Sequence, residues 1–250
     1  MNLSIGIFGI MRLLIILLLF AHPTLAQPFD TTRRTEPDGR EFFSVRGNGA
    51  IMDEGYFLNG QRDGVWLQYW DNGIPKNITT YRGGKRNGVH TALNRNGFTE
   101  AVQHYRNDQL HGTSRSYYPG ARLKEERTYT DGIMDGPYTI YYQNGKPQET
   151  GQYASGKHTG PATFYYESGT KAAEYQYIND ALSGAFKSYY ANGQVEEEGD
   201  YFKGAKDGLW KEWYANGKPR AEGGYNIRDE KISAWKEWDD AGSVRTVHYK

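Results

Sequence analysis

Aromatic and glycine positions recur along most of this chain with a fixed 24-residue period. A tyrosine marks the start of seven successive units, and we call its place position zero. These tyrosines are Tyr81, Tyr105, Tyr129, Tyr153, Tyr177, Tyr201 and Tyr225, and Phe57 precedes them on the same spacing. A fixed period of this length is typical of a repeat array, in which each unit buries its apolar surface against its neighbours.

Within each unit, two short runs rich in aromatic and β-branched residues lie between turns, which predicts a β-hairpin. We expect one strand in a stretch such as Leu209 to Tyr214, and the return strand in a stretch such as Pro219 to Tyr225. A glycine recurs at position seven of the seven full units, which argues against helices, and the last unit has Ile232 there instead. These structural turn glycines are Gly64, Gly88, Gly112, Gly136, Gly160, Gly184 and Gly208.

An Asn-Gly pair recurs between the two runs of most units. The pairs are Asn72-Gly73, Asn96-Gly97, Asn144-Gly145, Asn192-Gly193 and Asn216-Gly217, and Asn48-Gly49 occupies the same place in a partial unit. Such a pair is the strongest short-range hairpin signal, because both central residues of a type I′ turn need positive φ. We therefore predict type I′ turns at these pairs.

These patterns predict an all-β chain whose tandem 24-residue hairpins form one elongated, twisted antiparallel meander sheet. Eight units give about sixteen strands. We assign residues 42–56 to an N-terminal half-repeat cap, 57–224 to seven full repeats and 225–250 to a divergent C-terminal capping repeat, because array ends need modified units. Residues 27–41 are predicted to be a flexible leader.

The N-terminal segment, residues 1–26, differs from the rest of the chain. Arg12 precedes an uninterrupted apolar run, Leu13 to Ala21, and small residues follow at Thr24 and Ala26. This pattern predicts a signal peptide over residues 1–26, with cleavage before Gln27. An uncleaved anchor is the alternative, since the preceding residues would lengthen the apolar run. We therefore expect an exported chain, periplasmic or extracellular, that is not an integral membrane protein once the signal is cleaved.

Charge and cysteine content narrow the function classes. The chain has 30 basic and 30 acidic residues, so nothing electrostatic favours nucleic acid. It has no cysteine, which excludes disulfides, a thiol nucleophile and a lipoprotein anchor. No motif indicates a cofactor.

The aromatic side chains are predicted to form ladders along the sheet. Positions 9 and 13 share one face and position 12 lies on the other, because side chains alternate along a strand. The ladder is either structural packing between neighbouring rings or a partly exposed groove for a partner. The candidate binding residues are Trp66, Trp70, Tyr118, Tyr142, Tyr166, Tyr190, Trp210 and Tyr214.

The unit Tyr-x-x-Gly-x-x-x-Gly-x-Trp/Tyr-x-x-Tyr/Trp-Tyr-x-Asn-Gly resembles the MORN repeat, from Phe42 to Lys250. It is most similar to the bacterial variant found in YwqK-family antitoxins. The resemblance implies a β-hairpin scaffold that contacts a protein or membrane lipid, and the antitoxin label implies capture of a toxin. It supplies no catalytic residues. With an export signal, immunity against a toxin acting in the envelope or a role in envelope assembly fits better than a cytosolic antitoxin.

A second, looser resemblance is to choline-binding and cell-wall-binding repeats, in which aromatic cages hold a quaternary ammonium through cation–π contacts. The alternative function is therefore binding of an envelope glycan or lipid headgroup through an aromatic ladder. The length of the period and the hairpin phase are closer to the MORN pattern.

Other candidate sites are weaker. His90, His104 and His111 could approach one another and bind zinc, but no other unit repeats them, so we predict no metal site. The run from Glu196 to Glu198 could hold an acid–base pair, but glutamate recurs at position 21 of several units, so we predict a scaffold role and no catalytic residue. Asn77-Ile78-Thr79 is a glycosylation sequon only for a eukaryotic source.

Overall fold

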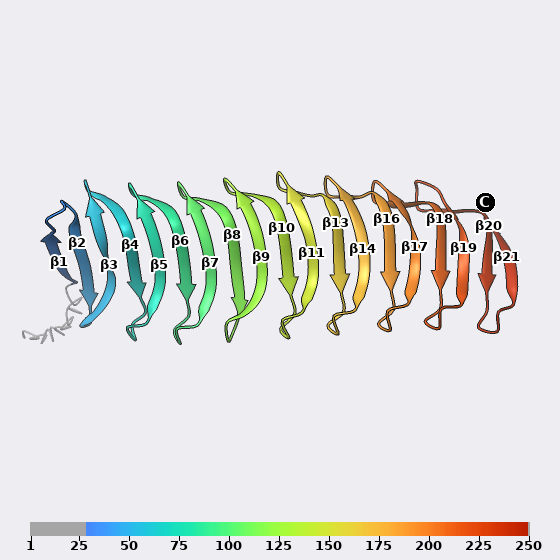
Figure 1. Cartoon of the computed structure of the whole chain (residues 1–250), viewed down its shortest axis with the longest axis horizontal. Coiled ribbons are helices and arrows are strands. Elements are labelled where there is room, and N and C mark those ends of the chain that lie inside the picture. The colour runs from blue at the N-terminus through green and yellow to red at the C-terminus, as the bar shows by residue number, and fades with distance from the viewer. Residues whose placement is uncertain (1–28, 250) are drawn as a thin grey trace, which may run out of the picture.

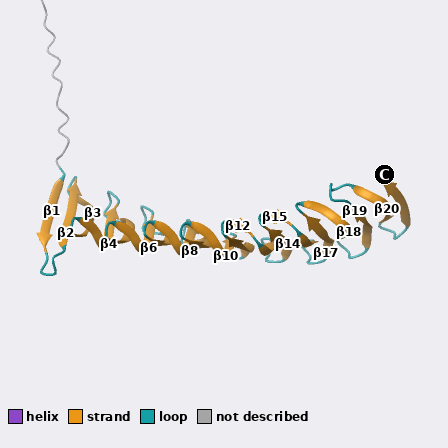
Figure 2. Cartoon of the chain, turned by 90° about the horizontal axis from the view of Figure 1, so that it is seen from above, coloured by secondary structure: helices purple, strands orange, loops and turns teal. Residues whose placement is uncertain are grey.

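The computed structural model describes residues 29–249, so the predicted signal segment lies outside the described residues. The described chain is all-β. Its 21 strands form one open antiparallel sheet in which successive strands pair, and this confirms the predicted meander (Figure 1). Seen from above in Figure 2, the sheet is a single long layer that curves gently. Among residues 29–249 the structure contains no helix able to cross a membrane.

The strands are β1 (Asp30–Thr35), β2 (Glu41–Gly47), β3 (Ala50–Leu58), β4 (Gln61–Tyr69), β5 (Pro75–Arg82), β6 (Lys85–Leu93), β7 (Thr99–Arg106), β8 (Gln109–Tyr118), β9 (Arg122–Thr130), β10 (Ile133–Tyr141), β11 (Pro147–Ala154), β12 (Lys157–His158), β13 (Gly160–Tyr165), β14 (Lys171–Ile178), β15 (Ala181–Leu182), β16 (Gly184–Tyr189), β17 (Val195–Phe202), β18 (Ala205–Trp213), β19 (Pro219–Tyr225), β20 (Lys231–Trp238) and β21 (Val244–Tyr249). From β4 onward they make the eight expected hairpins. The pairs β12/β13 and β15/β16 are each one strand that is interrupted beside the position-seven glycine.

The predicted type I′ geometry is wrong at most of the Asn-Gly pairs. At the turn after β18, the Gly217 amide donates to the Tyr214 carbonyl (2.8 Å) and the Tyr214 amide donates to the Lys218 carbonyl (2.9 Å). Gly217 has a φ of 80°, whereas Asn216 is not among the residues with positive φ. This is a type I turn followed by a glycine bulge, the next most common hairpin connection. Only Asn48-Gly49, where φ is 53° and 78°, has the type I′ form.

The type I′ turns lie instead at positions 2 and 3, where one unit passes into the next. Asn59-Gly60 has φ values of 50° and 75°, and Lys203-Gly204 has 50° and 91°. Each of these turns is a two-residue loop, as the pairing of Phe202 with Ala205 shows. The twist of a type I′ turn matches that of the flanking strands, so these tight turns keep successive units close together.

Three of the asparagines in the Asn-Gly pairs, Asn72, Asn144 and Asn192, link neighbouring turns. The Asn192 side-chain oxygen accepts from the Gln194 amide (3.0 Å), and its Nδ2 donates to the Ala215 carbonyl of the next unit (2.8 Å). Asn72 and Asn144 make the same pair of bonds. Asparagine therefore recurs here because its amide holds one turn against the next.

The flexible leader predicted over residues 27–41 is not what the structure shows from Asp30 onward. Asp30–Thr35 forms β1, which pairs with β2 along its whole length. Arg33 forms an ion pair with Glu41 (2.8 Å) and lies 5.0 Å from the centroid of the Phe43 ring. The polar sequence of β1 does not predict a strand, because the contacts that hold β1 come from residues of β2, which follows it.

Candidate interaction faces of the sheet

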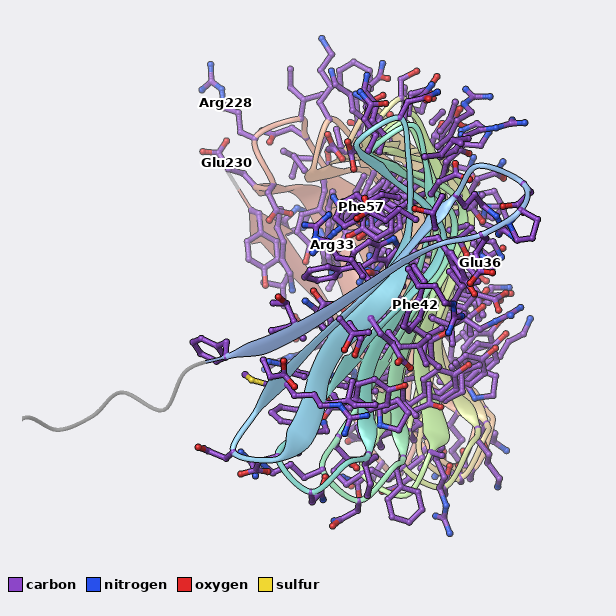
Figure 3. The ribbon with its side chains drawn as sticks, turned by 90° about the vertical axis from the view of Figure 1, so that its left-hand side faces the viewer. Arg33, Glu36, Phe42, Phe57, Arg228 and Glu230 are labelled. Atoms are coloured by element: carbon purple, nitrogen blue, oxygen red, sulfur yellow. The ribbon has the colours of Figure 1, made fainter. Side chains whose placement is uncertain are left out.

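The two faces of the sheet carry different side chains. Around β18, Trp210 lies opposite Gly223 and Lys211 lies opposite Glu222, and adjacent residues point to opposite faces. We call the face that carries positions 0, 9, 11, 20 and 22 the aromatic face, and the face that carries positions 8, 10, 12, 21 and 23 the charged face. In the end-on view of Figure 3, Phe57 and Arg33 lie on the aromatic side of the ribbon and Phe42 on the charged side.

Three tryptophans of the aromatic face lie flat over a glycine of the preceding strand. These pairs are Trp66 over Gly55, Trp210 over Gly199 and Trp235 over Gly223, and a Cβ added at any of these glycines would fall closer than 3.0 Å to the indole. Each indole Nε1 donates to a backbone carbonyl of the same preceding strand, at 2.9 to 3.2 Å. The glycine at position 22 therefore exists to admit the ring at position 9.

The outer side of each indole is covered by a cation of the same chain. Arg62 lies 4.2 Å from the Trp66 centroid, Lys206 lies 3.9 Å from Trp210, and Lys231 lies 4.0 Å from Trp235. Carboxylates hold two of these cations, as Arg62 pairs with Asp53 at 3.1 Å and Lys206 with Glu197 at 2.9 Å. Burial raises the pKa of Asp53, and the Arg62 charge opposes that shift.

Two of the eight candidate binding residues, Trp66 and Trp210, are therefore inaccessible to a ligand. Trp66 is 2% exposed and Trp210 is 0% exposed, because backbone covers one side of the ring and a cation covers the other. The expectation that they line an open groove is wrong. The structural alternative, in which neighbouring rings cover one another, describes them correctly.

The other six candidates, at position 13, are half-buried and bond the next unit. The Tyr142 hydroxyl donates to the Tyr165 carbonyl (2.6 Å), and the Tyr190 hydroxyl donates to the Trp213 carbonyl (2.8 Å). Tyr118, Tyr166 and Tyr214 repeat this bond, and the Trp70 Nε1 makes its equivalent. Their polar groups are already used within the array, although part of each ring remains accessible.

Position 12 lies on the charged face, and two of its phenols bond glutamates of position 21. Tyr69 donates to Glu54 and Tyr189 donates to Glu174. Burial, followed by these hydrogen bonds, raises the pKa of Tyr69 and of Tyr189 to about 12. The neutral phenols are thus the stable donors at physiological pH.

The middle of the aromatic face has no permanent cation at position five. His158 occupies that place. Its ring stacks on Tyr138 (5.5 Å between centroids) and makes tilted contacts with Tyr153 (4.1 Å) and Tyr177 (5.1 Å). Ala162 replaces the large ring at position nine, and Tyr175, opposite it, replaces the glycine. In this unit the small residue therefore stands at position nine and the aromatic ring at position 22, so one ring still fills the space between the two strands.

The remaining chemical candidates do not converge. His90 lies opposite Gln103 and His104 lies opposite the neighbouring Val89, so the two imidazoles point to opposite faces. Within residues 29–249 no group of three potential ligands could hold a metal. Glu197 and Glu198 also face apart, and each pairs with a lysine. Asn77 is half-buried in β5 and donates to Gln68 (2.9 Å), which hides the sequon.

An open groove of about 530 Å³ lies at the C-terminal end of the array, between β18 and β21. Its acids are already paired, Glu212 with Arg220 (3.0 Å) and Glu237 with Arg245 (2.7 Å). The Arg245 guanidinium lowers the pKa of Glu237, so this carboxylate stays ionised. A carboxylate held in this way is a poor general acid.

The MORN repeat variant family matches the chain at five segments, residues 62–82, 134–155, 159–179, 182–203 and 206–226. Each matched segment is one hairpin with its type I turn at the centre. The hairpins β6–β7 and β8–β9 lie outside the matches, yet they pair in the same way. A search of curated proteins gave no match.

Proposed function

We propose that this chain is an exported, non-enzymatic repeat scaffold that binds a protein partner through its sheet. The observation that carries the proposal is the internal use of the aromatic rings. Cations of the chain cover the position-nine indoles, and backbone carbonyls of the next unit accept the position-13 hydroxyls. What remains is a rigid, open, two-faced surface, which suits a macromolecule better than a small ligand.

The family match supports a scaffold role, because MORN-type hairpins supply packing and no catalytic group. We further propose an immunity-like role against a toxin that acts in the envelope, or a role in envelope assembly. The apolar run of residues 13–21 supports the location outside the cytoplasm.

Glycan or lipid-headgroup binding, the alternative, is less well supported. A quaternary ammonium needs free aromatic faces, and at Trp66, Trp210 and Trp235 those faces already hold Arg62, Lys206 and Lys231. Sugar stacking would need exposed rings in the same way, and the position-13 rings are only partly accessible.

The test is capture of partners by the mature chain from crosslinked envelope extracts of the producing cells. We expect mass spectrometry to identify one protein in stoichiometric amount, and added cell-wall sugars to leave its recovery unchanged. Retention on purified cell-wall material, lost when Tyr142, Tyr166, Tyr190 and Tyr214 are changed to alanine, would support the alternative instead. Turnover of any substrate by the purified chain would refute the non-enzymatic assignment.

A further inference from the structure

The charged face carries exposed apolar side chains on its C-terminal half. Leu209 is 59% exposed, Ile178 is 55%, Ile133 is 53% and Phe202 is 44%. Pro137, Pro161 and Ala185, at the same position as Leu209 in their units, are also exposed. We call these seven residues the apolar strip. It runs from β10 to β18 along one side of the type I′ turns. Val65 and Val89 hold the position of Leu209 in the first two units and are exposed as well, so the charge beside the strip has to distinguish the two halves.

The pairing pattern places these side chains on one face. Phe202 lies opposite Ala205, Tyr201 opposite Lys206, and Asp200 opposite Asp207. Because Lys206 covers Trp210 on the aromatic face, its neighbours on either side, including Asp207, point to the charged face. Leu209 points the same way because Trp210 follows it. An open hollow there is lined by Ala185, Asp200 and Leu209 together.

Acidic side chains accompany the apolar strip. Asp200 and Asp207 are directly opposite each other, and neither forms an ion pair among the described residues. Like charges placed directly opposite destabilise a sheet, so a cation from a partner would relieve a repulsion that the fold leaves in place. Asp135 occupies the position of Asp207 three units earlier. Lys157 and Lys203 flank the strip, and the hollow beside Leu209 also contains Lys187 and Lys211, of which Lys187 is already paired with Glu198 (3.0 Å).

The charge of the chain changes along the array. Residues 29–130 contain fifteen basic and twelve acidic side chains, whereas residues 131–249 contain thirteen basic and eighteen acidic ones. At positions 1 and 4 the strip has Ile133, Ile178 and Phe202, whereas the N-terminal units hold Arg82, Lys85 and Arg106 and keep one exposed apolar residue there, Leu58. A basic partner is therefore attracted to the C-terminal half and repelled from the N-terminal half.

The spacing of the strip fits a helix that lies across the strands. Six strand spacings separate its ends by roughly 29 Å, and equivalent residues of successive units are about 9.6 Å apart. Two turns of an α-helix, about seven residues, advance about 10.5 Å. A heptad-spaced row of apolar side chains on a helix of about 20 residues can thus meet Pro137, Pro161, Ala185 and Leu209 in turn.

We propose that the apolar strip docks an amphipathic, basic helix of a partner protein, with its apolar side on the strip and its lysines or arginines beside Asp135, Asp200 and Asp207. This inference rests on the proposed protein-binding function and names the surface and the partner chemistry for it.

The test uses the mature chain and three synthetic peptides, each three heptads long. The first is a helix with leucines in heptad spacing and lysines on its flanks, the second replaces the lysines with glutamates, and the third has the first composition in scrambled order. We expect the first peptide to bind most tightly by fluorescence anisotropy. Equal binding of all three, or no binding of the first, would overturn the proposal.

Matched variants locate the site. Leu209→Ser and Asp207→Asn should each weaken binding of the lysine peptide about tenfold. Val65→Ser and Asp63→Asn change the same two positions in the first unit and should leave binding unchanged. Asp207→Asn should not lower the melting temperature, because it removes a like-charge contact, so weaker binding would not reflect unfolding. Equal effects at the two sites would refute the strip as the docking surface.

The same variants separate this inference from the proposed function. If Leu209→Ser and Asp207→Asn still capture the envelope partner as well as the unchanged chain does, the protein-binding function stands and the strip does not. If the unchanged chain captures no protein and binds no peptide, both fail.

Discussion

Replacing Gly223 with alanine tests whether glycine at position 22 admits the tryptophan of the next strand. A Cβ at Gly223 would fall closer than 3.0 Å to the Trp235 ring, which is 0% exposed. Relief would require the indole to move away from the sheet. That movement would break its hydrogen bond to the Gly224 carbonyl (3.1 Å) and its contact with Lys231 (4.0 Å).

The expected cost can be estimated from these contacts. Overpacking in a well-packed site costs about 1–3 kcal/mol, the indole hydrogen bond contributes about 1 kcal/mol, and the cation–π contact adds about 0.5–1 kcal/mol. Alanine gains about 0.5–1 kcal/mol over glycine within a strand because the unfolded chain is less flexible. We therefore expect Gly223→Ala to destabilise the C-terminal hairpin by about 2–4 kcal/mol.

The neighbouring glycine is a matched control. Gly224 also lies in β19 with an extended backbone, but its side-chain direction is toward the charged face, where an added Cβ would meet the Ile232 side chain at 3.2 Å. A flexible aliphatic side chain can yield by a few tenths of an ångström, so Gly224→Ala should cost less than about 1 kcal/mol.

The assay is native-state hydrogen exchange of the backbone amides of β19 and β20. Exchange measures local opening, which suits an array whose units need not unfold together. Equal protection in Gly223→Ala and Gly224→Ala would refute the reasoning. So would a destabilisation by Gly223→Ala that persists unchanged in a Trp235→Ala background, where no ring remains to be displaced.

Three further outcomes follow from the contacts between units. Tyr190→Phe should destabilise the units on either side by about 1 kcal/mol, seen as faster exchange in β16 and β18, because it deletes the bond to the Trp213 carbonyl; unchanged exchange would contradict this. Asn192→Asp keeps the acceptor for the Gln194 amide but loses the donor to the Ala215 carbonyl, so it should lower the melting temperature. Asn192→Gly removes both bonds at the same turn and should lower the melting temperature further. Burial raises the pKa of Tyr201 and Tyr225 to about 12, above the unfolded value near 10. The stability that these neutral phenols supply should therefore be complete below about pH 10 and be lost as the pH rises toward 12. An alkaline titration of phenolate absorbance that shows both tyrosines ionising near pH 10 in the folded chain would disprove this.

The repeat and its hairpins were predictable because their causes are local. Tyrosine at position zero and glycine at position seven recur within each unit, and both act on strands that are adjacent in sequence. The turn type was not predictable from Asn-Gly alone. The same dipeptide suits a type I′ turn and a type I turn with a glycine bulge, and the bond from Asn192 to the next turn, which gives asparagine its role, needs the neighbouring unit.

The ring orientation could have been found in the sequence. Gly55 precedes Trp66 and Gly199 precedes Trp210 by the same eleven residues, and Gly223 precedes Trp235 by twelve, one residue having been inserted. Where position 22 is not glycine, position nine is not tryptophan: Thr79 precedes His90 and Tyr175 precedes Phe186. Read across unit boundaries, this pairing predicts a ring that folds over the preceding strand. Within one unit, the same residues suggest an aromatic ladder that is open to ligands. That interpretation put Trp66 and Trp210 in an open groove, whereas both are buried.

A single-layer sheet has to stabilise itself without a second layer to cover its rings. The chain covers its largest rings with its own backbone and cations. Only eight apolar side chains among the described residues are buried. The aromatic face is consequently constrained at nearly every position by a neighbour one strand away. Positions 1, 4 and 8 of the charged face are less constrained, because most of their side chains are exposed. Variation confined to such positions, with Arg82 and Arg106 in one half and Ile178 and Phe202 in the other, is where a scaffold can acquire a partner without loss of stability.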